Sequence, residues 1–464
     1  MAAVQTVPGI AQGEFFGHPK GLFILFFTEM WERFSFYGMR ALLVLYMTKY
    51  LLINADQGMQ LFGYQYIVNF VTWFASTTGV EFTDPAQRIQ FISSQIYGLY
   101  TGFVYFTPFF GGMLADFVFG QRKTVYIGGV LMAIGHFMMA SESMFFLALL
   151  FLILGNGCFK PNISTQVGLL YPEGDARRDG AFTIFYMGIN LGAFLAPLVC
   201  GTLGQTMGWH YGFAAAGVGM IVGLIVYHFG AKYLPSDRMM QRAAAHDTKK
   251  EPLTPQEWKR IFALVFLCVV NIVFWAVYEQ QGNTLQLWAD QNTDFGWMPT
   301  SWYQSLNPFF IFAFAPLSTI LWAKQAKKGK EPSSVTKMGI GCLLLGVAFI
   351  IMIVASKVVA ADEKGSVWWL IGTTWVFTMG ELYLSPIGLS LVTKVAPARL
   401  VSMMMGMWFL SSFFGNYLSG VIGGYYGLVS KDTFFTLLTI MGLAAAAIFF
   451  IANKPLRKNL GVNV

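Results

Sequence analysis

The sequence contains few charged residues: Asp, Glu, Lys and Arg together make up only 11% of its 464 residues. A soluble globular domain carries about 25% charged residues, and no soluble core of this size could hide the 56% of residues that are hydrophobic. Apolar runs of about 20 residues recur along the chain, long enough to cross a hydrocarbon core about 30 Å thick. The composition therefore excludes an ordinary soluble protein and predicts an all-α membrane protein.

Other scarce features narrow the class further. The four cysteines lie in apolar segments, so we expect neither a disulfide framework nor a metal site. The net charge is +7, but no run of basic residues is dense enough to bind nucleic acid, so nucleic acid is not an expected partner. The N-terminus lacks a basic segment followed by an apolar one, so no cleaved signal peptide is expected. The apolar composition makes the lipid bilayer an expected partner. No organic cofactor or metal is predicted.

The apolar runs predict twelve transmembrane helices in two groups of six. Basic residues gather in alternate connections, which places both termini in the cytoplasm by the positive-inside rule. A polar linker separates the groups, so we expect an N-terminal bundle over 1–233, a linker over 234–258 and a C-terminal bundle over 259–464. The expected spans are 21–50, 92–118, 123–141, 144–169, 180–205, 211–233, 260–289, 300–323, 337–357, 366–393, 400–428 and 433–453.

Residues 51–91 form an insertion between the first two spans. Within it, Leu61 to Val80 is free of charge and about 20 residues long, but Gln65, Asn69 and Thr72 make it more polar than its neighbours. A span here would move the N-terminus to the outside. We therefore expect an extra amphipathic or partly buried helical hairpin at the outer face.

A small set of charges lies inside the apolar runs. Inserting one charged residue at the centre of a span costs roughly 2.5–3.5 kcal/mol, and such residues usually face a cavity and handle substrate or protons. A helix rises about 1.5 Å per residue, so Arg40 and Glu279 share a depth in the outer half of their spans. Three others lie nearer the middle of the membrane: Arg33, Lys160 and Glu381.

The run Glu29-Met-Trp-Glu32-Arg33 places two carboxylates and one guanidinium at positions i, i+3 and i+4, which share one face of a helix. Neighbouring carboxylates raise each other's pKa in a low dielectric, while arginine lowers it. The pattern therefore predicts a proton-responsive cluster. A static ion cluster that only supports packing is the alternative.

Five stretches resemble the proton-dependent oligopeptide transporter (POT) family of the major facilitator superfamily, in its bacterial form. They are ExxERFxxYG from Glu29 to Gly38, Gly111 to Thr124, Gly155 to Asn162, Phe182 to Phe194, and Gly380 to Pro386. They run from the first span to the tenth. The resemblance implies a major facilitator fold with substrate bound between the two bundles near mid-membrane, and a location in the bacterial inner membrane.

The resemblance also implies roles for individual residues. Arg33 and Lys160 would hold a peptide's carboxylate, and Glu381 would face its amino group, supported by Asn190 and Asn307. Glu29, Glu32 and Glu279 would take part in proton coupling, and Arg40 would pair with Glu279 in an outer gate. Side-chain pockets would be lined by Tyr37, Tyr105, Trp275, Ser385 and Trp408.

The predicted function is proton-coupled import of di- and tripeptides by a monomer that uses alternating access, not an enzyme activity. Transport of nitrate or another small anion is the main alternative, although a small anion does not need the carboxylate of Glu381. A membrane-embedded enzyme would need a His/Asp or metal-ligand cluster near an interface, and the sequence has none. A sensor without transport stays open. Side-chain selectivity and proton stoichiometry are not fixed by the sequence.

Overall fold

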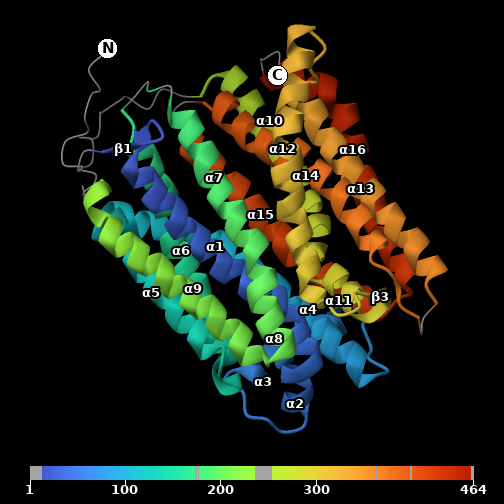
Figure 1. The fold of residues 1–464 in the computed structure, drawn as a ribbon. Helices are drawn as coiled ribbons and strands as arrows, with labels where there is room; N and C mark the ends of the chain where they lie inside the picture. Colours follow the sequence, from blue (N-terminus) through green and yellow to red (C-terminus); the bar gives the residue numbers. More distant parts are fainter. Residues whose placement is uncertain are drawn as a thin grey trace. The chain divides into compact units, whose positions relative to one another are not determined.

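The computed structural model describes residues 13–172, 175, 177–235, 253–360, 363–397 and 400–460. Most of the expected linker, residues 236–252, lies outside these residues. The described chain is almost entirely helical (Figure 1). Its helices are α1 (Lys20–Tyr46), α2 (Leu52–Asp56), α3 (Tyr64–Thr77), α4 (Pro85–Leu114), α5 (Gln121–Met138), α6 (Phe145–Leu169), α7 (Arg177–Ala196), α8 (Thr202–Thr206), α9 (Trp209–Gly230), α10 (Pro255–Tyr278), α11 (Thr284–Asn292), α12 (Leu306–Lys327), α13 (Ser334–Val358), α14 (Trp368–Val395), α15 (Val401–Gly424) and α16 (Lys431–Leu460).

The described residues also form short 3-10 and π-helical segments and two short two-stranded sheets. Strands β1 (Glu14–Phe15) and β2 (His18–Pro19) form an antiparallel hairpin directly before α1. Strands β3 (Thr293–Asp294) and β4 (Gly365–Ser366) pair in parallel and tie the residues after α11 to those before α14. Neither sheet contributes a membrane-crossing element, so the expected all-α membrane fold is confirmed.

Ten helical segments of the described chain are long and apolar enough to cross a membrane. They match ten of the twelve expected spans, and the other two correspond to α5 and α15. Helix α5 begins with Gln121, Arg122 and Lys123, and α15 buries several serines and Asn416, which lowers the mean hydropathy of both helices. Sequence reasoning thus located all twelve long helices of the described residues.

Two helices begin earlier than expected because their caps were overlooked. Helix α10 starts at Pro255, where Thr254 and Glu257 form a capping box that satisfies the first free N–H groups. Helix α4 starts at Pro85 instead of residue 92, and the Asp84 carboxylate accepts a hydrogen bond from the N–H of Ala86 at 3.1 Å. Both starts place proline in the first turn, where its missing N–H costs nothing.

The insertion between the first two spans contains the short helix α2 and the longer helix α3, so the expected extra helical segment is present. Helix α3 has 14 residues, or about 21 Å of length, which is too short to span the hydrocarbon core. The N–H of Phe62 donates to the carbonyl of Ser143 at 2.9 Å, and the Tyr64 ring stacks on Phe146. These contacts hold the start of α3 beside the start of α6.

The described chain divides into two compact units. Unit 1 comprises 1–46, 54–67 and 106–247, and unit 2 comprises 47–53, 68–105 and 248–464. The units are defined by contacts between residues, and their boundary cuts through α4. The expected bundles were defined by order along the chain instead. Their boundaries therefore stay a prediction. Each unit is described by itself below.

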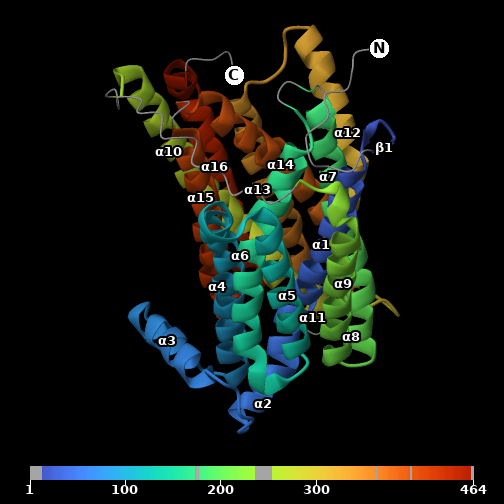
Figure 2. The ribbon, with the colours of Figure 1, turned by 90° about the vertical axis from the view of Figure 1, so that its left-hand side faces the viewer.

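In unit 1, α1 packs against α7 and α9, and α5 packs against α6 and α9 (Figure 2). Small residues allow the closest approaches. A Cβ atom added at Gly128 of α5 would lie 2.6 Å from the carbonyl oxygen of Gly155 in α6. At this spacing the helix backbones themselves are in contact, which is typical of packing in membranes.

In unit 2, α13 packs against α14 and α16, and α10 packs against α15 and α16 (Figure 1). The part of α4 from Pro85 to Tyr105 also belongs to this unit. There a Cβ atom at Gly98 would lie 2.6 Å from the Cα atom of Gly420 in α15. Gln90 of α4 donates to the carbonyl of Gly423 at 2.8 Å, so this part of α4 and α15 are joined by both packing and hydrogen bonding.

Candidate functional site

The three charged residues of the first motif lie on one buried face of α1. Glu29, Glu32 and Arg33 are only 2%, 0% and 3% exposed. Buried charges are tolerated only when they are paired and hydrogen-bonded. Their partners therefore define the site in unit 1.

Arg33 binds both carboxylates. Its guanidinium contacts Glu32 through Nε and Nη2, the second at 2.7 Å from Oε1, in a two-point arrangement. Nε also lies 3.3 Å from Oε1 of Glu29, one helical turn away. The other Glu29 oxygen, Oε2, is buried and has no hydrogen-bond partner among the described residues. One carboxylate is thus fully engaged, while the other offers an oxygen where a proton could bind.

Helix α6 supplies two further polar side chains. The amide of Asn156 donates to Oε1 of Glu32 at 3.2 Å, and the partly buried Lys160 interacts electrostatically with Glu29. Sequence reasoning found Lys160 but missed Asn156. Their i, i+4 spacing places both on one face of α6, and this signal could have identified Asn156.

Helix α7 approaches α1 directly beside the charged cluster. A Cβ atom at Gly192 would lie 2.2 Å from the carbonyl oxygen of Met30 and 3.0 Å from Cβ of Arg33. Two residues earlier, the buried Asn190 donates to the carbonyl of Tyr186 within its own helix at 2.9 Å. Tyr37 follows Arg33 by one turn of α1 and lies under the guanidinium of Arg40, 5.8 Å from the ring centroid.

In unit 2, the structure brings together two residues expected to recognise an amino group. The amide of Asn307, on α12, donates to Oε2 of Glu381, on α14, at 2.8 Å. It also donates to Oγ1 of Thr378 at 3.0 Å. Thr378 was not predicted, although it lies three residues before Glu381. Asn307 thus holds the carboxylate of Glu381 in a defined orientation.

Aromatic side chains lie on the same helices. The ring of Trp408, on α15, would collide with a Cβ atom at Gly388 of α14, at 2.3 Å, so the indole packs directly on the α14 backbone. Ser385 lies one turn before Gly388 and is partly buried. Trp275, on α10, is also partly buried, and its Nε1 has no hydrogen-bond partner among the described residues.

Glu279 lies just after α10 and is 2% exposed. The hydroxyl of Tyr97, on α4, donates to its Oε2 at 3.4 Å. Sequence reasoning missed Tyr97, since an apolar run gives no sign of which tyrosine faces a carboxylate. Arg40 belongs to unit 1, so its pairing with Glu279 stays a prediction. Tyr105 is partly buried at the end of the α4 segment assigned to unit 2.

The chain is similar to known proteins in both sequence and structure. A family model described as "POT family" matches residues 122–250 and 236–436. A peptide transporter, YePEPT, from Yersinia enterocolitica is 33% identical over 96% of each chain. A di-/tripeptide transporter from Lactococcus lactis subsp. cremoris is 32% identical over 96% of this chain and 97% of the relative. A crystal structure of a peptide transporter POT in complex with sulfate has a TM-score of 0.83 and 31% identity, over 97% of this chain and 98% of that one.

The fold, the relatives and the similar solved structure define a multi-pass helical membrane transporter with a major facilitator-like fold, not an enzyme. The chain belongs to the POT family. The resemblance drawn from the sequence motifs is therefore confirmed, whereas the roles of individual residues stay predictions.

Proposed function

We propose that the chain is a proton-coupled symporter that imports di- and tripeptides by alternating access. The names of the two relatives above support the substrate class. The observation that carries the proposal is the charge balance of the buried cluster on α1 and α6. Protons are the only coupling ion that the proposal requires.

The cluster contains two carboxylates, Glu29 and Glu32, and two cations, Arg33 and Lys160, so its formal charge is zero. A peptide carboxylate bound to Arg33 and Lys160 would add one negative charge to a site screened from water. Isolated charge is costly in such surroundings. One proton taken up by a glutamate restores neutrality, so proton and peptide carboxylate favour each other's binding.

Competition for Arg33 points the same way. Glu32 already occupies two guanidinium nitrogens, so an incoming carboxylate must share or displace it. A protonated carboxyl binds arginine far more weakly than a carboxylate does. Protonation of Glu32 or Glu29 would therefore release Arg33 for the peptide.

At the other end of the peptide, Glu381 would bind the amino group. The carboxylate is held by Asn307 at 2.8 Å, and one positive amino group would balance its charge. A small anion such as nitrate has no group for this carboxylate. Competition between dialanine and nitrate for uptake separates the two candidate substrates.

The decisive experiment is uptake of radiolabelled dialanine into proteoliposomes. When the solution outside the proteoliposomes is more acidic than the lumen, we expect dialanine to accumulate inside above its equilibrium concentration. Without the gradient, only exchange should occur. Absence of both accumulation and exchange would overturn the proposal.

Glu279→Gln tests the coupling. If ionised Glu279 pairs with Arg40 to keep the outside closed, the variant should lose uphill accumulation and keep counterflow exchange. Glu81→Gln, at an exposed position before α4, is the matched control and should retain both. Uphill uptake by Glu279→Gln would remove Glu279 from the mechanism without affecting the peptide assignment.

The sidedness proposed here places both termini in the cytoplasm, in the bacterial inner membrane, and the working form is a monomer. The basic residues in alternate connections support the orientation. Each charged cluster described above is complete within one chain, which supports a monomer.

A further inference from the structure

The hairpin before α1 exposes two aromatic side chains at one end of unit 1. Phe16 is 82% exposed and Phe15 is 51% exposed. Their rings cluster with Phe23 of α1, with centroids of Phe15 and Phe23 5.0 Å apart. One turn further along α1, Phe27 is also exposed. The aromatic patch of the hairpin is therefore continuous with an exposed apolar face of a predicted membrane span.

The backbone presents Phe16 in an unusual way. Phe16 and Gly17 form the two-residue turn of the hairpin, and both have positive φ, 49° and 76°. Such turns favour asparagine, aspartate or glycine at the first position, because other side chains are strained there. Among the described non-glycine residues, Phe16 alone has a positive φ. The hairpin therefore holds a large exposed apolar ring at a strained backbone position, and such positions often mark a binding site.

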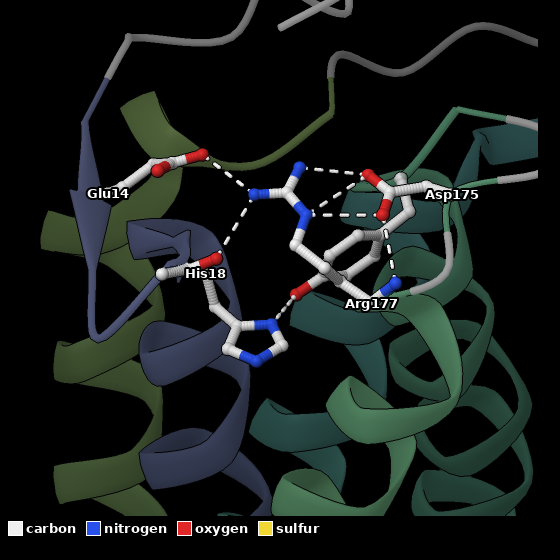
Figure 3. A network of polar contacts seen from close by, with 6 residues as sticks. Glu14, His18, Asp175 and Arg177 are labelled. Atoms are coloured by element: carbon white, nitrogen blue, oxygen red, sulfur yellow. Dashed lines mark hydrogen bonds and ion pairs between the residues drawn. The ribbon is translucent and has the colours of Figure 1, made fainter. Parts of the chain in front are cut away.

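A network of polar contacts clamps the hairpin to unit 1 (Figure 3). Arg177, at the start of α7, donates to Oε1 of Glu14 at 2.8 Å and to the carbonyl of Gly17 at 3.0 Å. It also pairs with Asp175 at 2.8 Å, and His18 hydrogen-bonds the hydroxyl of Tyr171 at 2.8 Å. These contacts fix the orientation of the hairpin relative to the start of α7.

Basic residues surround the same edge. The ammonium of Lys20 lies 5.8 Å from the ring centroid of Tyr233, and that of Lys232 lies 5.2 Å from the same ring. Both lysines are exposed, as is Arg178. The single acidic side chain of the hairpin, Glu14, is already bound by Arg177. Among the side chains that the structure describes, the exposed charge beside the aromatic patch is therefore mainly positive.

We propose that the β1–β2 hairpin is an interfacial membrane anchor that binds acidic phospholipids. Phe15 and Phe16 enter the boundary between headgroups and acyl chains, and Lys20 and Lys232 contact the lipid phosphates. Aromatic and basic side chains together are typical of segments that lie in a membrane interface. Attraction to an anionic leaflet supplies the charge complementarity.

The proposal is tested by a fluorescent probe at the tip of the hairpin in the full chain. The four native cysteines are buried, so Phe16→Cys can be labelled selectively with bimane and reconstituted into liposomes. Quenching by lipids brominated on the upper acyl chain is compared with quenching by aqueous iodide. Lys328→Cys, in an exposed loop, is the aqueous reference, and Ile225→Cys, exposed on α9, is the lipid reference.

We expect a blue-shifted label at position 16 that brominated lipids quench and iodide does not, as at position 225. Iodide quenching equal to that at position 328 would overturn the anchor. Protection from both quenchers would overturn it as well, because the ring would then be covered by protein.

A separate measurement tests whether Lys20 and Lys232 select acidic phospholipids. At equal mole fraction, brominated phosphatidylglycerol should quench the label more than brominated phosphatidylcholine. In the double variant Lys20→Gln/Lys232→Gln, this preference should be lost while the depth of the label is kept. If the preference persists in the double variant, the lysines do not select acidic lipid.

Discussion

The hydrogen bond between Asn307 and Glu381 makes a quantitative prediction about peptide affinity. Asn307→Ala removes a donor 2.8 Å from Oε2 of Glu381. A hydrogen bond to a charged group contributes about 1.5–3 kcal/mol, and every 1.4 kcal/mol corresponds to a tenfold change in affinity. If this bond holds Glu381 for the peptide's amino group, dialanine should bind about 10- to 150-fold more weakly.

A second substitution calibrates the first. Thr378→Val keeps the shape of the side chain and the bond from Asn307 to Glu381, but removes the neutral acceptor 3.0 Å from Asn307. A neutral hydrogen bond contributes about 0.5–1.5 kcal/mol, so affinity should fall only about 2- to 10-fold. Gln57→Ala, at an exposed position after α2, should change nothing.

The assay is calorimetric titration of purified protein with dialanine and with N-acetyl-dialanine, which lacks the amino charge. Only dialanine should be affected by Asn307→Ala, because the acetylated peptide cannot use Glu381. Thermal unfolding of each variant checks that the protein stays folded. Equal losses for both ligands would show that Asn307 supports the fold and not amine recognition. Unchanged or tighter dialanine binding would refute the reasoning, since the bond would then compete with the substrate.

Three further predictions follow from the described contacts. Lys160→Ala should abolish measurable dialanine binding and gradient-driven uptake in a folded protein, with Lys328→Ala as an unaffected control; normal binding would reduce Lys160 to a structural partner of Glu29. Gly111→Ala should lower the unfolding temperature through overpacking of about 1–3 kcal/mol, because its Cβ would lie 1.9 Å from the Gly157 carbonyl. Gly112→Ala, with nothing within 4 Å, should be neutral, and equal effects would contradict the packing. Finally, hydrogen bonds from Arg177 lower the pKa of the Asp175 carboxyl below 3.8, so the stability advantage over Asp175→Asn should be present above that pH and lost as pH falls through the lowered value. A pH-independent difference in unfolding temperature between these two proteins would exclude that linkage.

The sequence predicted the helices well because their cause is local. Runs of apolar residues match the thickness of a bilayer, and this match does not depend on which helices are neighbours. The starts of α4 and α10 were misplaced because Asp84 and Thr254 precede polar first turns that hydropathy alone assigns to loops. Cap residues followed by proline carried the missing signal.

The charged part of the site was also visible in the sequence, because a charge in an apolar run is costly and therefore conspicuous. The neutral hydrogen-bond partners of these charges were not visible in the sequence. Asn156, Tyr97 and Thr378 each hydrogen-bond a predicted residue or its partner, yet asparagine, tyrosine and threonine occur in spans for many reasons. Their roles depend on which helices pack together, and hydropathy does not encode that.

The neutral residues explain why the charged set can be both stable and responsive. Glu32 accepts from Arg33 and from Asn156, so removing either donor still leaves one partner. Glu29 shares Arg33 and keeps one oxygen without a partner among the described residues. A proton should therefore reach Glu29 with less loss of hydrogen bonding than it would cause at Glu32. Coupling by Glu29 should then fail in Glu29→Gln, whereas Asn156→Leu should first alter the pH profile of uptake, because it leaves Glu32 with Arg33 alone.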